Sequence, residues 1–325
     1  MPNNVRRNHH YVCEFLLKNF ADDKGKLWIY DSEQQKYWAG NTKSAGFERD
    51  LYALTLRGRG RDFGILEKGL EQQIDTPGAV AIRKLVNRQM CDGMEWENFL
   101  RFVAAQMVRT PEYIERLKAM EAPIMQEMLE RMAKLEPEFR EGVRNDMKEA
   151  GATDEDVERV IEAVANGKCR AQPTQAWIVA SAVRAIPMIQ AELKDMHWTF
   201  LAVPEEEPEL LINDRPVMLA EPGPEDEHSR PLGLRSPNIE LVMPMSRRMV
   251  AVARRDGPDS FGELVKGSAE IVNARMLSYA RRFVFASYRS DDLLAAVVRQ
   301  RSRGPKLRSR RMQIGEQLVL VSEYR

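Results

Sequence analysis

The stretch QAWIVASAVRAIPMIQAELKDMHWTFLAVP, residues 175–204, changes its hydrophobic period once along its length. Its first part, residues 175–196, carries apolar residues at helical spacing and contains Pro187, which is expected to kink a helix. From His197 the sequence alternates in the manner of a strand, and short strands separated by proline-rich turns follow to about residue 255. A helix that leads directly into strands predicts a fold of the α+β class.

The segments on either side extend this division. The pattern is helical over about 63–195, strand-rich over about 196–255, and returns to helices and a final strand over 256–325. Near the N-terminus, KLWIYD (26–31) and KYWAG (36–40) alternate like the two strands of a hairpin. We therefore predict a single domain over residues 1–325, with a predominantly α-helical middle and a small mixed or antiparallel sheet built from N-terminal and C-terminal segments.

The composition is that of an ordinary globular protein. Of 325 residues, 43% are hydrophobic and 30% are charged, which is not the composition of a disordered chain. No apolar run reaches the roughly 20 residues that a membrane span needs, and the N-terminus lacks the apolar segment of a secretory signal. The three cysteines are far apart and odd in number, so neither a disulfide framework nor a paired-cysteine zinc site is expected. We expect a cytoplasmic protein without membrane contact.

The charges are balanced overall but unevenly distributed. Residues 205–227 are acidic and rich in proline, whereas residues 299–311 are basic and contain no acid. Such segregation can mark an interaction surface, and nucleic acid is a candidate partner for the basic run. The residues that would contact it are Arg299, Arg301, Arg303, Lys306, Arg308, Arg310 and Arg311. The alternative is that the run forms a solvated loop.

Two adjacent histidines, His9 and His10, stand before an apolar run. Neighbours point to opposite faces of a strand and diverge by about 100° on a helix, so the two rings cannot easily share one ligand. We expect one ring to face a site as a general base or metal ligand while the other orients it or packs. We favour His10 for the site because it lies closer to the anchored run. The alternative is a solvated pair, but the following residues form a helical stripe that ties the segment to the core: Val12, Phe15, Leu16, Asn19 and Phe20.

Gln106 and Arg109 extend an apolar, inward-facing stripe of a predicted helix. A buried amide and a buried guanidinium both need hydrogen-bond partners. These partners are either backbone carbonyls or the carboxylate or phosphate of a ligand. We consider both residues candidates for substrate binding.

Three further polar residues interrupt apolar patterns. Asp214 lies in LLINDRPVMLA (210–220), where a loop could project a carboxylate, although Asp-x-Pro is also an ordinary turn. Asn273 shares a helical face with apolar residues and therefore points inward, and Glu48 lies in the short apolar segment FERDLYAL (47–54). No P-loop, GxGxxG, GxSxG or HExxH motif accompanies these residues.

The opening NHHYVCEFLLKNF (8–20) resembles the HHYVPxFLLRNF opening of a bacterial family, the domain-of-unknown-function family 4238. Further family-like segments follow in the expected order: KLWIYD, FERDLY, AAQMVRTP, LLINDRPV, IELVMPMSRRMVAV and IVNARMLSYARRFVFAS. The resemblance covers nearly the whole chain and is weakest over about 112–170. The chain departs from the pattern at Cys13, where proline is usual, and around Asp214, where Asn-Asp-Arg-Pro replaces Ser-Asp-Asn-Pro. The resemblance implies a recurring polar set without a reaction: His9, His10, Glu48, Gln106, Arg109, Asp214 and Asn273.

Three functions are compatible with these residues. The first is a nuclease-like hydrolase that cleaves phosphodiesters, with catalytic residues His9, His10, Glu48 and Asp214, and with Gln106, Arg109 and Asn273 binding substrate. A divalent metal is its candidate cofactor. The second is a non-catalytic binding or sensor protein of a bacterial defence or toxin system. The third is a hydrolase or transferase that acts on a small molecule or a protein.

Overall fold

The computed structural model describes residues 7–56, 60–62, 64–170, 172–220, 233–301, 307–314 and 317–324. Its helices are α1 (Glu14–Lys18), η1 (Thr42–Ser44), α2 (Ile65–Leu70), η2 (Glu71–Asp75), α3 (Thr76–Val86), α4 (Gly93–Val108), α5 (Pro111–Leu135), α6 (Pro137–Glu149), α7 (Asp154–Ala165), α8 (Gln175–Lys194), α9 (Ser268–Tyr279) and α10 (Asp291–Arg301). Its strands are β1 (Asn8–His10), β2 (Leu27–Asp31), β3 (Lys36–Gly40), β4 (Phe47–Arg49), β5 (Leu54–Leu56), β6 (Gly60–Asp62), β7 (His197–Ala202), β8 (Ile212–Asn213), β9 (Met218–Ala220), β10 (Glu240–Ser246), β11 (Met249–Arg254), β12 (Ser260–Glu263), β13 (Phe283–Ala286), β14 (Leu307–Ile314) and β15 (Gln317–Tyr324).

An antiparallel sheet joins the two ends of the fold. Its strand order is β3-β2-β13-β8, so the N-terminal hairpin pairs with a strand from near residue 285. A second, mixed sheet has the order β12-β7-β11-β10-β9, in which β12 runs parallel to β7. The prediction of an α+β fold with a helical middle and sheets built from N-terminal and C-terminal segments is therefore confirmed.

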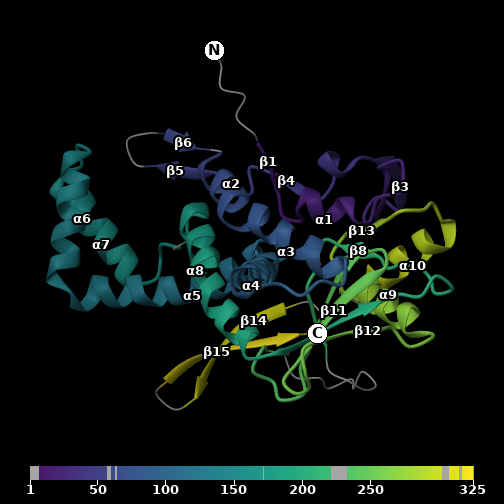
Figure 1. Ribbon diagram of the computed structural model, residues 1–325. Coiled ribbons are helices and arrows are strands. Elements are labelled where there is room, and N and C mark those ends of the chain that lie inside the picture. The colour runs from purple at the N-terminus through teal and green to yellow at the C-terminus, as the bar shows by residue number, and fades with distance from the viewer. Residues whose placement is uncertain are drawn as a thin grey trace.

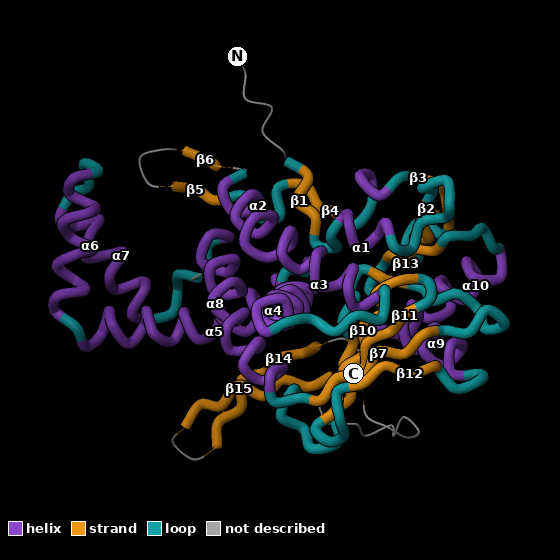
Figure 2. The backbone as a smooth tube through the Cα atoms, in the orientation of Figure 1, coloured by secondary structure: helices purple, strands orange, loops and turns teal. Residues whose placement is uncertain are grey.

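The helical middle is organised around α4, which packs against α3 and α8. An Asp92–Glu95 capping box begins α4, and Pro111 at the first position of α5 follows its Thr110 cap. Helices α6 and α7 project to one side at the far end of α5 (Figure 1). The strands of the mixed sheet gather at the other side of the body (Figure 2). Helix α8 runs without interruption through Pro187.

An aromatic cluster connects α4 to the mixed sheet. Trp198 and Phe200 alternate inward along β7, and both are fully buried against Phe99 of α4. Ring centroids lie 4.9 Å apart for Phe99 and Trp198, in the edge-to-face arrangement that aromatic pairs prefer. The strand pattern that begins at His197 thus lets β7 bury its apolar face against α4 in one core.

Among the described residues, one helix, α8, is long and apolar enough to cross a membrane by length and composition alone. This differs from the expectation that no such segment exists, because α8 has few charges despite Arg184 near its middle. In the structure α8 packs along α4 and against α5.

Candidate functional site

A pocket of about 170 Å³ lies where five segments of the chain meet. These segments are the β1–β4 ribbon, the turn between β2 and β3, the start of α5, the turn after β8 and the residues at the start of β13. We call it the Glu48 pocket, and its lining residues are Tyr11, Glu33, Glu48, Pro111, Glu112, Asp214, Arg215, Arg281, Arg282 and Phe283. Two of the predicted site residues, Glu48 and Asp214, therefore converge, although 166 residues of sequence separate them.

The register of the β1–β4 ribbon decides which side chains can reach the pocket. His9 pairs with Glu48 and His10 pairs with Phe47, and residues directly opposite each other share a face of a sheet. Tyr11 follows directly after β1 and lines the pocket together with Glu48, whereas His10, which pairs with Phe47, does not.

Gly46 brings the segment after β1 close to β4. Its carbonyl accepts hydrogen bonds from the backbone N–H groups of Tyr11 and Val12 at 2.9 and 3.1 Å. Its φ is +64°, and a Cβ atom there would lie 3.0 Å from the Cβ of Val12. Only glycine meets both requirements without strain, so this position fixes where Tyr11 leaves the ribbon.

Asp214 holds the approach to β13. Its carboxylate accepts three backbone hydrogen bonds, from Arg281 at 2.9 Å, Arg282 at 2.7 Å and Phe283 at 2.9 Å. Burial raises the pKa of Asp214, and the three N–H donors oppose that shift because they favour the ionised carboxylate. Asp214 is a wall of the pocket whose oxygens are already engaged by the backbone.

Asn273, another predicted site residue, does not reach the pocket. Its side-chain oxygen accepts from the backbone N–H of Leu211 at 2.8 Å, and its amide donates to the carbonyl of Glu209 at 2.9 Å. Asn213 acts similarly, because it donates to the carbonyl of Met276 at 2.6 Å. The two asparagines therefore clamp the segment before Asp214 against α9.

Each of the three arginines that line the pocket has a carboxylate partner. Arg215 Nε lies 2.6 Å from Glu112, and Arg281 Nη2 lies 2.9 Å from Glu115. Arg282 donates two hydrogen bonds to Asp31, at 3.0 and 2.7 Å, and also pairs with Glu33 at 3.1 Å. The positive charges of the pocket are therefore matched within the protein.

Glu48 and Tyr11 differ from these pairs. Among the described residues, no cation lies within ion-pair distance of Glu48 and no group hydrogen-bonds the hydroxyl of Tyr11. Although Glu48 is exposed as a residue, partial burial of its carboxyl group raises its pKa, which Arg281 opposes and Glu115 reinforces. Burial, with the charges of Asp214 and Glu48, raises the pKa of Tyr11 well above its ordinary value.

The two histidines lie outside the pocket. His9 is fully buried, stacks on Tyr52 with ring centroids 5.4 Å apart, and accepts the Tyr52 backbone N–H at Nδ1. The ring of His10 packs edge-on against Phe47, and its Nδ1 lies 3.8 Å from Glu67 Oε1. Its Nε2 is buried without a partner among the described residues. The inward ring is therefore His9, whereas the sequence favoured His10.

Gln106 and Arg109 belong to a second polar group, which we call the Arg109 cluster: Cys13, Asp75, Gln106, Arg109, the backbone carbonyl of Tyr11, and Tyr52 with its partner His9. The Arg109 guanidinium is buried, donates to the Tyr11 carbonyl at 3.0 Å and to Asp75 at 2.8 Å, and contacts the Cys13 thiol. Gln106, which is fully buried, contacts both that thiol and the guanidinium through its side-chain amide.

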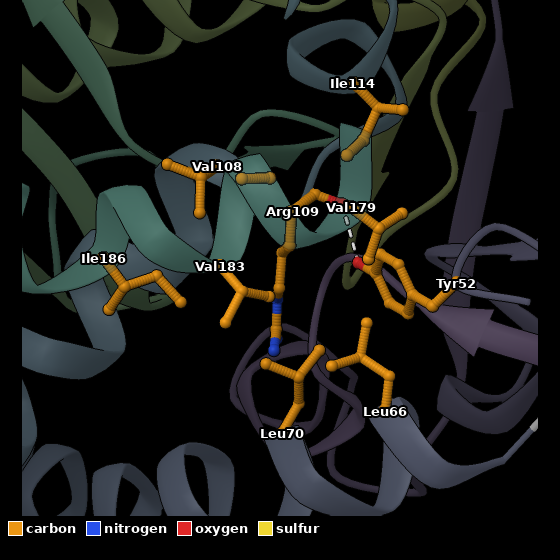
Figure 3. A pocket seen from close by; sticks show the side chains of 10 residues that line it. Tyr52, Leu66, Leu70, Val108, Arg109, Ile114, Val179, Val183 and Ile186 are labelled. Atoms are coloured by element: carbon orange, nitrogen blue, oxygen red, sulfur yellow. Dashed lines mark hydrogen bonds between the residues drawn. The ribbon is translucent and has the colours of Figure 1, made fainter. Parts of the chain in front are cut away.

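Figure 3 shows the apolar surroundings of Arg109. Arg109 extends past apolar side chains of α2 and α8, and the Tyr52 hydroxyl donates to its backbone carbonyl at 2.6 Å. The cavity beside it holds only about 10 Å³, about the space of one water molecule. Burial opposes ionisation of Arg109, but the adjacent Asp75 raises its pKa, so the cation is retained. Burial raises the pKa of the Cys13 thiol well above its ordinary value.

No described residue of the basic run 299–311 is among the lining residues of the Glu48 pocket. Arg299 and Arg301 end α10, and Arg308, Arg310 and Arg311 lie on β14. Arg303 and Lys306 lie outside the described residues. The described residues also include no group of three or more His, Cys, Asp or Glu side chains that could hold a metal ion. The metal and nucleic-acid predictions therefore stay predictions.

Sequence reasoning missed eight of the ten lining residues, among them Tyr11, Arg215, Arg281 and Arg282. Adjacent arginines before an apolar strand, as in YARRFVFA (279–286), were an available signal. Tyr11 gave no such signal, because a tyrosine in an apolar run is indistinguishable from a core residue.

Comparison with known proteins identifies the family of the chain but gives no function. A family model described as "Protein of unknown function (DUF4238)" matches residues 8–290, and the chain belongs to this family. The match includes every lining residue of the Glu48 pocket and excludes β14 and β15. No curated protein and no solved structure matches the chain.

Proposed function

We propose that this member of the DUF4238 family is a binding protein that takes a small polar ligand in the Glu48 pocket. The observation that carries the proposal is the pair of uncommitted polar groups, the Glu48 carboxylate and the Tyr11 hydroxyl, in a pocket whose other charges are paired. Polar groups that serve only the fold are satisfied by the protein itself, as the Arg109 cluster is. Groups left open in a concavity are suited to a ligand.

The size and charge of the pocket limit the ligand. About 170 Å³ is less than the 300–1,000 Å³ of typical sites for drug-sized molecules, so a small molecule or one protruding group fits. A groove that binds nucleic acid carries an excess of cations along its length. Here the lining has four carboxylate side chains against three arginines. The lining therefore favours the binding function over contact with a polyanion.

A thermal-shift screen tests the proposal. Wild-type protein, Glu48→Gln and the control Glu263→Gln, which changes an exposed glutamate on β12, are heated with a library of small polar compounds. We expect at least one compound to raise the Tm of wild type and of the control but not of Glu48→Gln, since binding to the native state stabilises it. A screen in which every stabilising compound acts equally on all three proteins contradicts the proposal.

A phosphodiester-cleaving, nuclease-like hydrolase is the second candidate. One arrangement favours it: the pKa of Glu48 is raised, and Arg281 is close enough for its charge to oppose that shift. Glu48 would supply a proton to the leaving oxygen while Arg281 stabilised the phosphate. The basic run at 299–311 would hold the nucleic-acid backbone.

The hydrolase candidate is tested with total RNA and plasmid DNA, with and without Mg²⁺. Cleavage that Glu48→Gln abolishes and Glu263→Gln retains supports it. Nucleic acid that stays intact at high protein concentration under both conditions contradicts it. The same assay with His10→Ala tests the role expected for that histidine, which the position of His10 outside the pocket predicts to be dispensable.

A further inference from the structure

We infer that the group recognised in the Glu48 pocket is a cation, an ammonium or guanidinium carried by a small molecule or by a protein side chain, bound between the Glu48 carboxylate and the Tyr11 hydroxyl. The inference rests on the proposed binding function and names its ligand class. Three features of the described residues carry it: the pairing of the arginines, the two open oxygens, and the cost of the opposite charge.

Two of the three arginines are already engaged by carboxylates of the protein, which disfavours an anion. Arg282 is held by the bidentate contact with Asp31, which is fully buried, and by a second carboxylate, Glu33. Arg215 is fixed between Glu112 and the face of the Tyr279 ring, 3.7 Å from its centroid. A ligand anion would have to displace these carboxylates and then lie beside them.

Arg281 is the most accessible of the three, and it leads to the same conclusion. Its side chain is 40% exposed, and its partner Glu115 is 63% exposed, so this ion pair is weak and could be opened. An anion bound there would still face Glu48, Glu112 and the displaced Glu115. Like charges at such distances repel, so an anion gains little from replacing Glu115.

The two open oxygens form the acceptor side of a cation site. Glu48 has no ion-pair partner among the described residues, and it lines the pocket. Tyr11 is only 3% exposed, yet its hydroxyl has no hydrogen-bond partner in the described part of the chain, and it lines the same pocket. A phenolic oxygen accepts from N–H donors, and a carboxylate adds charge to the contact. Because the Tyr11 oxygen is not itself buried, water or a ligand can reach it from the pocket.

Binding of matched probes tests the inference. N-acetyl-arginine amide represents a side chain, and agmatine represents a free cation. N-acetyl-citrulline amide is the neutral shape analogue, and inorganic phosphate is the anion. Titration calorimetry on wild type is expected to show binding of at least one cationic probe, at least about tenfold weaker binding of citrulline amide, and no binding of phosphate. The cationic probe that binds more tightly shows whether the recognised cation is carried by a protein side chain or by a small molecule.

Variants locate the binding. Glu48→Gln should lower the affinity for the cationic probe by at least about tenfold, because the charge of the side chain is lost while its shape is kept. Tyr11→Phe should weaken it by a few fold, and Glu263→Gln should leave it unchanged. A near-wild-type Tm of each variant shows that it is folded.

The other outcomes are contradictory in different ways. Binding of citrulline amide or phosphate that depends on Glu48 overturns the cation but leaves the binding pocket intact. A cationic probe that binds equally well to Glu48→Gln overturns the inferred site. Failure of all four probes overturns the cation inference, and the compound screen then decides whether the binding function fails with it.

Discussion

The Arg109 cluster and the Glu48 pocket lie on either side of Tyr11, and both collect polar side chains from distant parts of the chain. In the Arg109 cluster the guanidinium is buried and every partner is protein: a backbone carbonyl, Asp75 and Cys13. In the Glu48 pocket the arginines are likewise paired, but Glu48 and the Tyr11 hydroxyl are open. The backbone of Tyr11 belongs to the first group, and its hydroxyl belongs to the second.

This difference separates polar residues that hold the fold from those that the proposed function assigns to a ligand. Gln106, Arg109, Asp214 and Asn273 are all buried, and three of them hydrogen-bond directly to backbone groups of other segments. Such contacts fix the chain because an unpaired backbone group in the interior is costly. A residue that serves ligand binding is instead recognised by what it leaves open.

The largest effect is expected at Arg109. Arg109→Gln leaves Asp75 and the Tyr11 carbonyl without their buried partner, so we expect the free energy of unfolding to fall by about 3–5 kcal/mol. Arg281→Gln is the matched control, because it breaks only an exposed ion pair and should cost about 0–1 kcal/mol. Urea unfolding monitored by circular dichroism measures both. Equal losses for the two arginines would remove the distinction between the two regions.

Asn273 is expected to rank next. Asn273→Ala removes the partners of the Leu211 N–H and the Glu209 carbonyl, and the unfolding free energy should fall by about 2–3 kcal/mol. Asn87→Ala, which changes an exposed residue after α3, should stay within about 0.5 kcal/mol of wild type. The same urea titration applies. If Asn273→Ala retained wild-type stability but lost ligand binding, the clamp assignment would fail.

A smaller loss is expected when one hydroxyl is removed from the Arg109 cluster. Tyr52→Phe deletes the hydrogen bond to the Arg109 carbonyl and keeps the ring that stacks on His9. The unfolding free energy should fall by about 1 kcal/mol. Tyr11→Phe is the control in the pocket and should leave stability nearly unchanged, because its hydroxyl has no protein partner among the described residues. Reversed effects at the two tyrosines would contradict the comparison.

The smallest effect is the pH dependence of Glu48. The pKa of this carboxyl is raised in the native state, so the folded protein holds the proton more tightly than the unfolded chain does. The contribution of Glu48 is therefore full below the ordinary glutamate pKa of about 4.3 and is lost as pH rises through the higher native value. The unfolding free energy of Glu48→Gln relative to wild type should rise across that interval. A difference that is flat with pH would show that the carboxyl is not desolvated.

Ligand binding should show the opposite pH dependence. A bound cation requires ionised Glu48, so affinity for the arginine probe should increase as pH rises through the native pKa of Glu48. Burial of this carboxyl raises that value, Arg281 opposes the shift and Glu115 adds to it. Calorimetric titrations at several pH values measure the effect, and affinity that increases toward low pH would contradict the cation assignment.

The fold was largely predictable because the helical and strand-like patterns each continue over a long segment of the sequence. The change at His197 and the hairpin at residues 26–40 both appear where the sequence places them. The site was less predictable. Helical spacing correctly placed Arg109 inside, but spacing cannot tell a guanidinium that binds backbone from one that binds a ligand. Which of the two histidines points inward depends on the register of β1 against β4, and a local sequence pattern does not reveal that register.

The carboxylates of Asp214 and Glu48 line the same pocket, so they test the central claim most directly. The free energies of unfolding of Asp214→Asn and Glu48→Gln are measured in urea at neutral pH. Because both oxygens of Asp214 accept backbone N–H groups, Asp214→Asn places an amide donor against a donor and should lose about 2–3 kcal/mol. Glu48→Gln should lose none. An equal loss at both positions, or a loss at Glu48 alone, would contradict the claim that one carboxylate holds the fold and the other is open for a ligand.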